Sequence, residues 1–283
     1  MPSLRDLRRR IQSVKKTQQI TRAMRMVSAA KLRRAQQRIL AARPYSDRMI
    51  RMLQDVMAAN PELEHPLLER RTSKTRYELV VVTSDRGLAG AFNLNVLKLA
   101  QRELAERGRE FREISLYLIG RKAGEFFRRR RPREIDVARL FGVASYDTAV
   151  EVASHLTKRY LAGEIDAAEI VYSEFASALS QTPRVVTLLP PRIPKTEDTA
   201  PFDAEPDLGK LLALLVPKTF EVAIHRALLE SEAGEHGARM TAMEAATRNG
   251  EEMITSLTLR FNHARQAAIT RELVEIITGA EAL

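Results

Sequence analysis

A glycine-bearing turn lies between an apolar run and a helical pattern at residues 83–93, which read TSDRGLAGAFN. A strand-to-helix turn of this kind can bind phosphate, because the first backbone N–H groups of a helix lack partners within it. The spacing matches neither the dinucleotide fingerprint nor the P-loop pattern, and the P-loop pattern occurs nowhere in the chain. We interpret the segment as a structural turn and expect this chain alone to bind no nucleotide.

Residue types that support catalysis or metal binding are present but not in a recognisable pattern. The five histidines, at positions 65, 155, 225, 236 and 263, show no metal-ligand spacing. The chain has no cysteine, which excludes disulfides and thiolate-bound zinc. Glu272 and Glu275 lie three residues apart on a predicted helix, where surface charge is commoner than a catalytic pair. We therefore expect no catalytic residue, no cofactor and no metal.

The positive charge is concentrated at the N-terminal end. Residues 1–51 hold fifteen Lys and Arg against two acidic residues, a net charge of +13, whereas the whole chain carries +10. Such a segment predicts an acidic partner: nucleic acid, an anionic membrane or an acidic protein surface. Nucleic-acid binders usually add aromatic side chains for stacking, and lipid-surface helices favour Trp or Phe, but Tyr45 is the only aromatic residue before residue 60. A basic coiled-coil nucleic-acid-binding protein remains the alternative to a protein-binding subunit.

No apolar run reaches the length of about 18 residues that a membrane-spanning helix needs. The basic residues 8–10 are not followed by the apolar region of a secretory signal. We expect a soluble, intracellular protein.

Residues 3–59 are predicted to form one long helix, with Ser3 as N-cap and Asp6 completing a capping-box variant. Pro44 predicts a bend or weak point. Heptad positions are apolar at both ends of the segment and polar in its middle. They are Leu4, Leu7, Ile11 and Val14, then Gln18, Thr21, Arg25 and Ser28, then Leu32, Ala35, Ile39 and Ala42. A second apolar stripe, Ile20, Met24 and Val27, is expected to cover the polar gap one face over.

A second long helix is predicted from Leu208 to about Thr278, with an early interruption at Pro217. Its heptad positions are Met240, Met243, Ile254, Leu257, Phe261 and Ala264, and after a shift of one residue Ile269, Leu273, Ile276 and Ala280. Burying each Leu or Ile side chain contributes roughly 1.5–3 kcal/mol, so neither stripe should stay exposed. The two helices are therefore predicted to pair as an antiparallel coiled coil.

Between the helices the pattern changes to that of an α/β unit. Residues 60–76 are expected to be a linker, and four β-rich runs follow at 78–83, 115–119, 168–172 and 184–189. Helical stretches near 91–107, 121–130 and 146–163 separate the first three runs, which predicts a largely parallel sheet. The expected organisation is an N-terminal coiled-coil helix (1–59), an inserted Rossmann-like globular α/β domain (60–207) and a C-terminal coiled-coil helix (208–283). A small α/β enzyme with helical arms is a further alternative.

Sequence blocks at both ends resemble one known family. Residues 4–24, LRDLRRRIQSVKKTQQITRAM, and residues 26–32, MVSAAKL, are similar to the opening helix of the gamma subunits of F-type ATP synthases. Residues 239–249, RMTAMEAATRN, and 262–276, NHARQAAITRELVEI, resemble the closing helix of that family. The turn at 84–93 and the block IVYSEF at 170–175 resemble internal blocks, so the resemblance spans nearly the whole chain.

The resemblance implies a rotating central shaft without a catalytic site of its own. It implies a coiled coil inside a ring of alternating alpha and beta subunits, and a globular part that rests with the epsilon subunit on the membrane c-ring. Turning of the shaft then changes the affinity of each beta subunit for ADP, phosphate and ATP. Ala89 stands where the family often has Cys, and the chloroplast-type insert is absent. This points to a bacterial-type enzyme at the cytoplasmic face of the inner membrane, to which the chain binds peripherally.

The resemblance also implies residue roles. Arg239, Gln266, Thr270 and Glu272 are expected to hold a loop of the beta subunit. Met24 matches a position where a change to a charged residue should impair coupling. The basic residues expected to face an acidic beta-subunit loop are Arg8, Arg9, Lys15 and Lys16.

Overall fold

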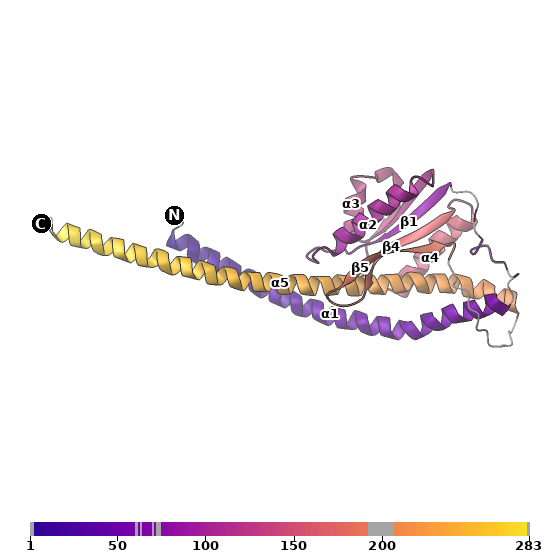
Figure 1. The fold of residues 1–283 in the computed structure, drawn as a ribbon, viewed down its shortest axis with the longest axis horizontal. Coiled ribbons are helices and arrows are strands. Elements are labelled where there is room, and N and C mark those ends of the chain that lie inside the picture. Colours follow the sequence, from indigo (N-terminus) through magenta and orange to yellow (C-terminus); the bar gives the residue numbers. More distant parts are fainter. Residues whose placement is uncertain are drawn as a thin grey trace. The chain divides into compact units, whose positions relative to one another are not determined.

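The computed structural model describes residues 3–59, 62, 64–69, 71, 75–191 and 207–281. Its contacts divide the chain into two compact units, one of Met1–Ser28 with Met240–Leu283 and one of Ala29–Arg239. Two long helices, α1 (Leu4–Ala59) and α5 (Leu208–Glu281), contribute to both units (Figure 1). Seven residues of the expected linker at 60–76, and all of residues 192–206, lie outside the described residues.

The first unit begins with the predicted helix cap. The Asp6 N–H donates to the Ser3 hydroxyl at 3.2 Å, and the Ser3 N–H donates to the Asp6 carboxylate at 3.3 Å. The two residues thus satisfy each other's backbone donors, as in a capping box. The Asp6 carboxylate also lies in the first turn of α1, where the helix dipole favours negative charge. The predicted start of the helix is confirmed.

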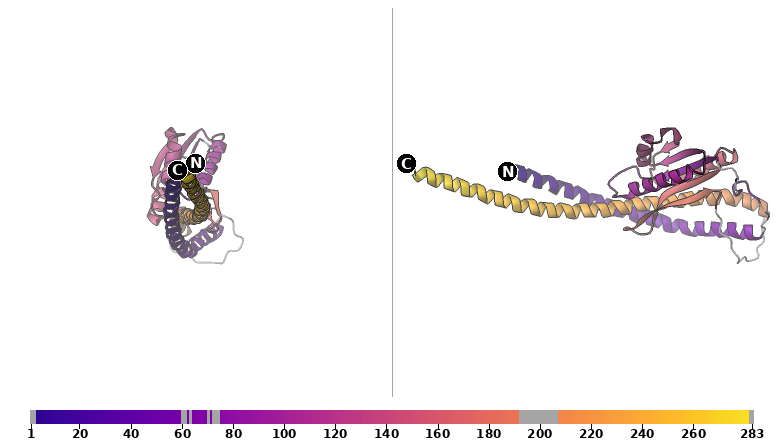
Figure 2. Two further views of the ribbon diagram at one scale, coloured as in Figure 1. Left: turned by 90° about the vertical axis from the view of Figure 1, so that its left-hand side faces the viewer. Right: turned by 45° about the horizontal axis from the view of Figure 1, so that its top comes forward.

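The two helical segments of the first unit lie side by side and run in opposite directions (Figure 2). The Arg25 guanidinium reaches the Glu244 carboxylate at 3.5 Å, and the Arg8 guanidinium lies 5.6 Å from the ring centre of Phe261. Residue numbers therefore rise on one helix as they fall on the other, which confirms the predicted antiparallel pair. Gly250, halfway between these contacts, lies against Gln18.

Most of the predicted seam faces the partner helix, including its polar middle. Leu7, Thr21 and Ser28 of α1 are buried, and so is Met243 of α5. The second apolar stripe does not cover the seam, because Ile20 and Val27 are 60% and 57% exposed while Met24 is half-buried. That prediction was wrong: polar side chains fill the centre of the pair themselves, so the stripe is left on the outside.

The shifted heptad of α5 is also exposed. Ile269, Leu273 and Ile276 keep 49%, 54% and 67% of their surface accessible. Arg8 lies against Phe261, and α1 begins only four residues before Arg8, at Leu4. A few residues beyond Phe261, α5 therefore has no α1 residue opposite it. The prediction that both stripes are buried within the chain therefore holds only as far as about Ala268. Ala280 lies among the side chains that the structure does not describe.

The second unit is built on a five-stranded sheet of order β3-β2-β1-β4-β5. Its strands are β1 (Arg76–Val82), β2 (Glu113–Ile119), β3 (Ile135–Arg139), β4 (Ala167–Phe175) and β5 (Gln181–Leu189). All pairs are parallel except β4 with β5, so the predicted largely parallel sheet is confirmed. The prediction missed β3, a five-residue edge strand whose alternately exposed residues are Asp136 and Ala138.

Helices cover both faces of the sheet (Figure 1). The helices α2 (Phe92–Arg107), α3 (Arg121–Arg128) and α4 (Tyr146–Leu161) match the three predicted helical stretches. Leu79 and Val81 of β1 pack with Val96 and Ala100 of α2 in the main apolar core. Glu78 alternates with them along the strand and points to the opposite face, where α4 lies.

Residues 227–239 of α5 are buried on every side within the second unit. On one side the Glu232 carboxylate pairs with the Arg38 guanidinium of α1 at 2.7 Å. On another side a Cβ placed on Gly234 would lie 3.1 Å from the Phe92 ring, and one on Gly237 would lie 3.3 Å from the Ala178 backbone. The glycines that weaken helix propensity here allow close packing of α5 on the sheet.

Pro44 and Pro217 both lie inside uninterrupted helices, so the predicted interruption at Pro217 is wrong. Each proline removes one backbone hydrogen bond, and packing of the surrounding helix compensates for the loss. A cavity of about 480 Å³ lies between these stretches of α1 and α5. Its walls include Ile39, Tyr45 and Val222.

Candidate partner-binding surface

Four of the predicted contact residues form two basic rows on the first four turns of α1. Arg8 and Lys15 lie seven residues apart, as do Arg9 and Lys16, so each pair shares one face of the helix. All four side chains are exposed, and no ion pair joins them to a carboxylate within the described part of the chain. The Arg8 guanidinium also covers the Phe261 ring of α5. Concentrated, unneutralised positive charge of this kind attracts an acidic surface.

Met24 lies between two exposed apolar neighbours on α1. Ile20 lies four residues before Met24 and Val27 lies three residues after it, about one helical turn in each direction. The three side chains therefore share one face of α1 and form a short ridge. The ridge lies outside the polar centre of the helix pair, which contains Thr21 and Arg25. A small exposed apolar ridge of this kind is a candidate surface for contact with another protein.

The end of α5 presents a polar row and an apolar stripe. Gln266 and Thr270 are one turn apart and exposed, and the Thr270 hydroxyl donates to the Gln266 carbonyl at 3.0 Å. Glu272 is exposed on a different side of the helix. The apolar stripe of Ile269, Leu273 and Ile276 lacks a covering helix among the described residues. Its burial requires another molecule.

Arg239 is placed differently from the other predicted contact residues, because it belongs to the second unit and is buried. Its guanidinium donates to the Glu235 carboxylate at 2.6 Å and to the Gly87 carbonyl at 3.2 and 3.3 Å. Burial raises the pKa of the Glu235 carboxyl, and the Arg239 charge opposes this rise. Burial, with the charges of Arg239 and Lys31, lowers the pKa of His236 to about 4. Arg239 therefore connects α5 to the turn at 83–93.

That turn is filled by its own polar groups. The Asn93 side-chain oxygen accepts from the Ser84 N–H at 2.9 Å, and the Ser84 hydroxyl donates to the Arg86 carbonyl at 2.6 Å. Asp85 accepts from the backbone of Arg121, Phe141 and Gly142, which lowers the pKa of its carboxyl against the opposing effect of burial. The geometry is that of a structural turn that fixes neighbouring loops.

Sequence reasoning did not identify the exposed apolar side chains at this carboxyl edge of the sheet. Leu88, Leu140 and Val143 are 64%, 57% and 63% exposed. Leu88 also has a positive φ of 63°, which is unusual for a residue with a Cβ. In the sequence, the one indication is that Leu88 lies inside a glycine-bearing turn. This position alone does not show whether its side chain is exposed or buried.

Comparisons with known proteins agree over the full length of the chain. The family model described as ATP synthase matches residues 3–283. An ATP synthase gamma chain from Anaeromyxobacter dehalogenans (strain 2CP-C) is 51% identical, and one from Pelotomaculum thermopropionicum is 49% identical, each over 100% of both chains. Among the described residues, no helix is both long and apolar enough to cross a membrane.

Solved structures show the same fold at low sequence identity. A chain of the Euglena gracilis mitochondrial ATP synthase, in a structure of OSCP, F1 and the c-ring, is 22% identical with a TM-score of 0.66, covering 99% of this chain and 94% of that one. A chain of the Tetrahymena thermophila mitochondrial central stalk and c-ring is 23% identical with a TM-score of 0.61, covering 80% and 99%. With two full-length relatives near half identity, the chain belongs to the family of ATP synthase gamma chains.

Proposed function

We propose that this chain is the central rotor shaft of a bacterial ATP synthase. In this role it couples proton-driven rotation of the c-ring to conformational changes of the beta subunits. The observation that carries the proposal is the apolar stripe of Ile269, Leu273 and Ile276, which remains exposed at the end of a long helix in a chain of this family. A ring of alternating alpha and beta subunits encloses such a helix end and buries its apolar side chains.

The charge distribution supports the same partner. The two basic rows on α1, with Arg8, Arg9, Lys15 and Lys16, are suited to an acidic loop of the beta subunit. Met24 provides an apolar contact beside them, and Gln266, Thr270 and Glu272 provide polar contacts on α5. Since a rotating shaft presents these groups to each beta subunit in turn, it biases each one toward a different affinity for nucleotide.

In this proposal the chain supplies contacts and no catalytic residue. The second unit rests, with the epsilon subunit, on the c-ring, and the chain is bound peripherally at the cytoplasmic face of the inner membrane. The alternative function, nucleic-acid binding, rested on the charge of residues 1–51 alone and gains nothing from the family membership.

The proposal is tested by assembly with purified alpha and beta subunits. The full chain should co-elute with them as one complex and stimulate ATP hydrolysis, while the isolated chain should hydrolyse no ATP. A chain that ends at Ala268 should still assemble but deliver less torque in a rotation assay, because burial is shared along the helix. Failure of the full chain to co-elute, together with steeply salt-dependent DNA binding, would instead support the nucleic-acid alternative.

A further inference from the structure

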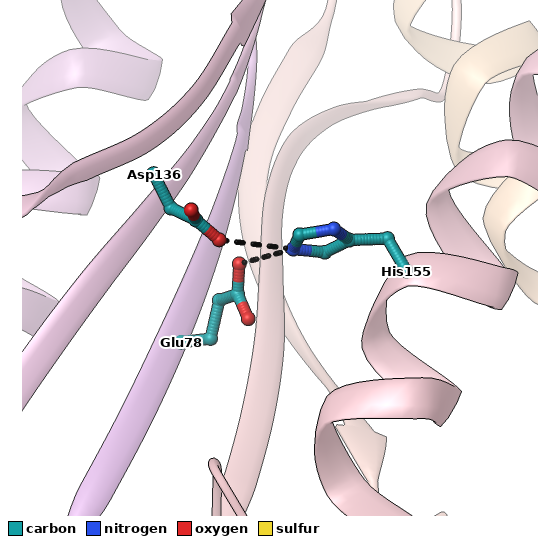
Figure 3. A group of neighbouring side chains, drawn as sticks. All are labelled: Glu78, Asp136 and His155. Carbon is teal, nitrogen blue, oxygen red and sulfur yellow. Dashed lines mark hydrogen bonds and ion pairs between the residues drawn. The ribbon is translucent and has the colours of Figure 1, made fainter.

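Three side chains from separate elements of the second unit converge on one point (Figure 3). The Nε2 atom of His155 in α4 lies 3.2 Å from Oε1 of Glu78 in β1 and 3.1 Å from Oδ2 of Asp136 in β3. All three ligand atoms lie within 4.8 Å of one another. The group is far from the predicted partner contacts in sequence.

We propose that Glu78, Asp136 and His155 form a binding site for a divalent transition-metal ion of the zinc type. An imidazole nitrogen and two carboxylate oxygens are a common ligand set for such ions, with water in the fourth position. Bonds of about 2.0–2.2 Å in a tetrahedral arrangement place ligand atoms roughly 3.4 Å apart. The two distances from His155 Nε2 are already within a few tenths of an ångström of this spacing.

Burial and access suit a bound ion. The Glu78 side chain is fully buried, while the side chains of Asp136 and His155 keep 38% and 25% of their surface exposed. One ligand is thus fixed in the interior and two lie at an opening to water, through which an ion can enter. The imidazole ring is also held in place by an edge contact with Tyr117, whose ring centre lies 5.0 Å away. This pre-organises the nitrogen ligand.

The charges around the site leave room for a cation. The Arg159 guanidinium donates to Glu78 Oε2 at 2.8 Å, to Asp136 Oδ2 at 2.6 Å and to Glu164 at 3.2 Å. At the ligand atoms two carboxylates, Glu78 and Asp136, face one guanidinium, and the exposed Glu164 adds a third carboxylate on the far side of Arg159. With neutral His155 the surroundings of the site are therefore net negative. Because Arg159 uses Oε2 of Glu78, an ion bound to Oε1 leaves that pair intact. At Asp136 the guanidinium uses Oδ2, so an ion there shares Oδ2 with Arg159 or binds Oδ1.

A proton competes for the same position. The hydrogen bond to Glu78 raises the pKa of His155, with further support from the charges of Glu78 and Asp136 and against burial and the charge of Arg159. A metal ion binds only the neutral imidazole, so binding releases this proton.

The test is a titration of the full chain, purified without a histidine tag, with Zn²⁺ and separately with Co²⁺. The chain has no cysteine, so thiolates cannot contribute to binding. We expect one equivalent to bind, a visible Co²⁺ spectrum typical of tetrahedral coordination, and a rise in Tm with Zn²⁺. His155→Ala and Asp136→Asn should each weaken binding at least about tenfold and remove the Tm rise.

The matched control is His263→Ala, which removes an exposed histidine of α5 and should bind as the wild type does. Asp136 lies on an edge strand and is partly exposed, so Asp136→Asn keeps the test usable if His155→Ala unfolds. Absence of a one-equivalent site, or a site that survives both ligand variants, would overturn the proposal. Because the measurement uses the isolated chain, neither result bears on assembly with the alpha and beta subunits.

Discussion

The hydroxyl oxygens of Thr21 and Thr247 lie 2.8 Å apart between the two helices of the first unit. Each hydroxyl also lies within hydrogen-bond distance of a carbonyl of its own helix, Gln18 at 3.0 Å for Thr21 and Met243 at 2.7 Å for Thr247, so either hydroxyl can donate between the helices. Polar side chains in a helix seam fix register at some cost in stability. The pair therefore fixes the register of α1 against α5. Leucines at these positions would stabilise the helix pair without selecting one register.

This alignment predicts energetic coupling. Thr21→Val should destabilise the chain by about 1 kcal/mol, because a hydrogen bond is lost at a buried site. Adding Thr247→Val should recover part of this loss, since neither hydroxyl then lacks its partner. Urea unfolding of the two single variants and the double variant gives the coupling energy. Strictly additive effects would show that the two hydroxyls do not interact.

Arg239→Ala should destabilise the isolated chain by about 3–5 kcal/mol, because Glu235 would be left buried without its counter-charge. Combining it with Glu235→Gln should restore much of the stability. Equilibrium unfolding measures both, with the exposed Arg248→Ala as a control that should change stability by less than about 0.5 kcal/mol. If Arg239→Ala is as stable as the control, the residue serves partner contact alone.

Leu273→Asp should leave the stability of the free chain within about 0.5 kcal/mol of the wild type, because this side chain is exposed. Binding to the alpha and beta subunits should weaken by roughly 1.5–3 kcal/mol, the value of burying one Leu. Competition binding with labelled wild-type chain measures the difference. Leu259→Asp places the same charge on an equally exposed Leu of α5 and should weaken binding less. Equal losses would argue against an enclosed helix end.

Met24→Lys should allow assembly but reduce proton pumping per ATP hydrolysed, because it adds a charge to an apolar ridge that faces the beta subunit in the proposed function. Met24→Leu keeps the ridge apolar and should pump normally. Inverted membrane vesicles report hydrolysis and pumping in parallel. Unchanged pumping in the Lys variant would remove Met24 from the coupling surface.

His236→Gln should reduce the loss in free energy of unfolding as the pH falls below about 6.5. The pKa of His236 is lowered to about 4 in the folded chain. As the pH falls below about 6.5, the ordinary pKa of histidine, only the unfolded chain takes up a proton at this residue. The wild type should therefore lose on the order of 3 kcal/mol between pH 6.5 and 4 that the variant keeps. Urea unfolding at several pH values compares them. Parallel pH curves would contradict the buried, neutral state of His236.

The helices and the central strands could be predicted from the sequence because their signals are local. Ser3 and Asp6 mark the start of α1, and the heptad from Leu4 to Ala42 gives the side on which α1 meets α5. The polar interval at Thr21 was also placed correctly in the seam. The exposure of Ile20 and Leu273 was not predicted, because the spacing of apolar residues does not show whether they pack within the chain or against another molecule.

Long-range assembly explains what the sequence did not predict. β3 is only five residues long and paired on one side only, so its pattern is too weak to recognise. Glu78, Asp136 and His155 are brought together by sheet order, with β2 between the two strands, and no spacing rule encodes that. Pro217 was misjudged because tertiary packing outweighs the loss of one helical hydrogen bond.

The close packing at Gly234 and Gly237 has a mechanical consequence. A helix whose backbone almost touches the Phe92 ring and the Ala178 main chain cannot turn about its own axis there without steric overlap. In the proposed rotor, residues 227–239 are therefore the stretch expected to pass torsional load from the sheet into α5 without twisting. Elastic twist is then expected in other stretches of the two helices.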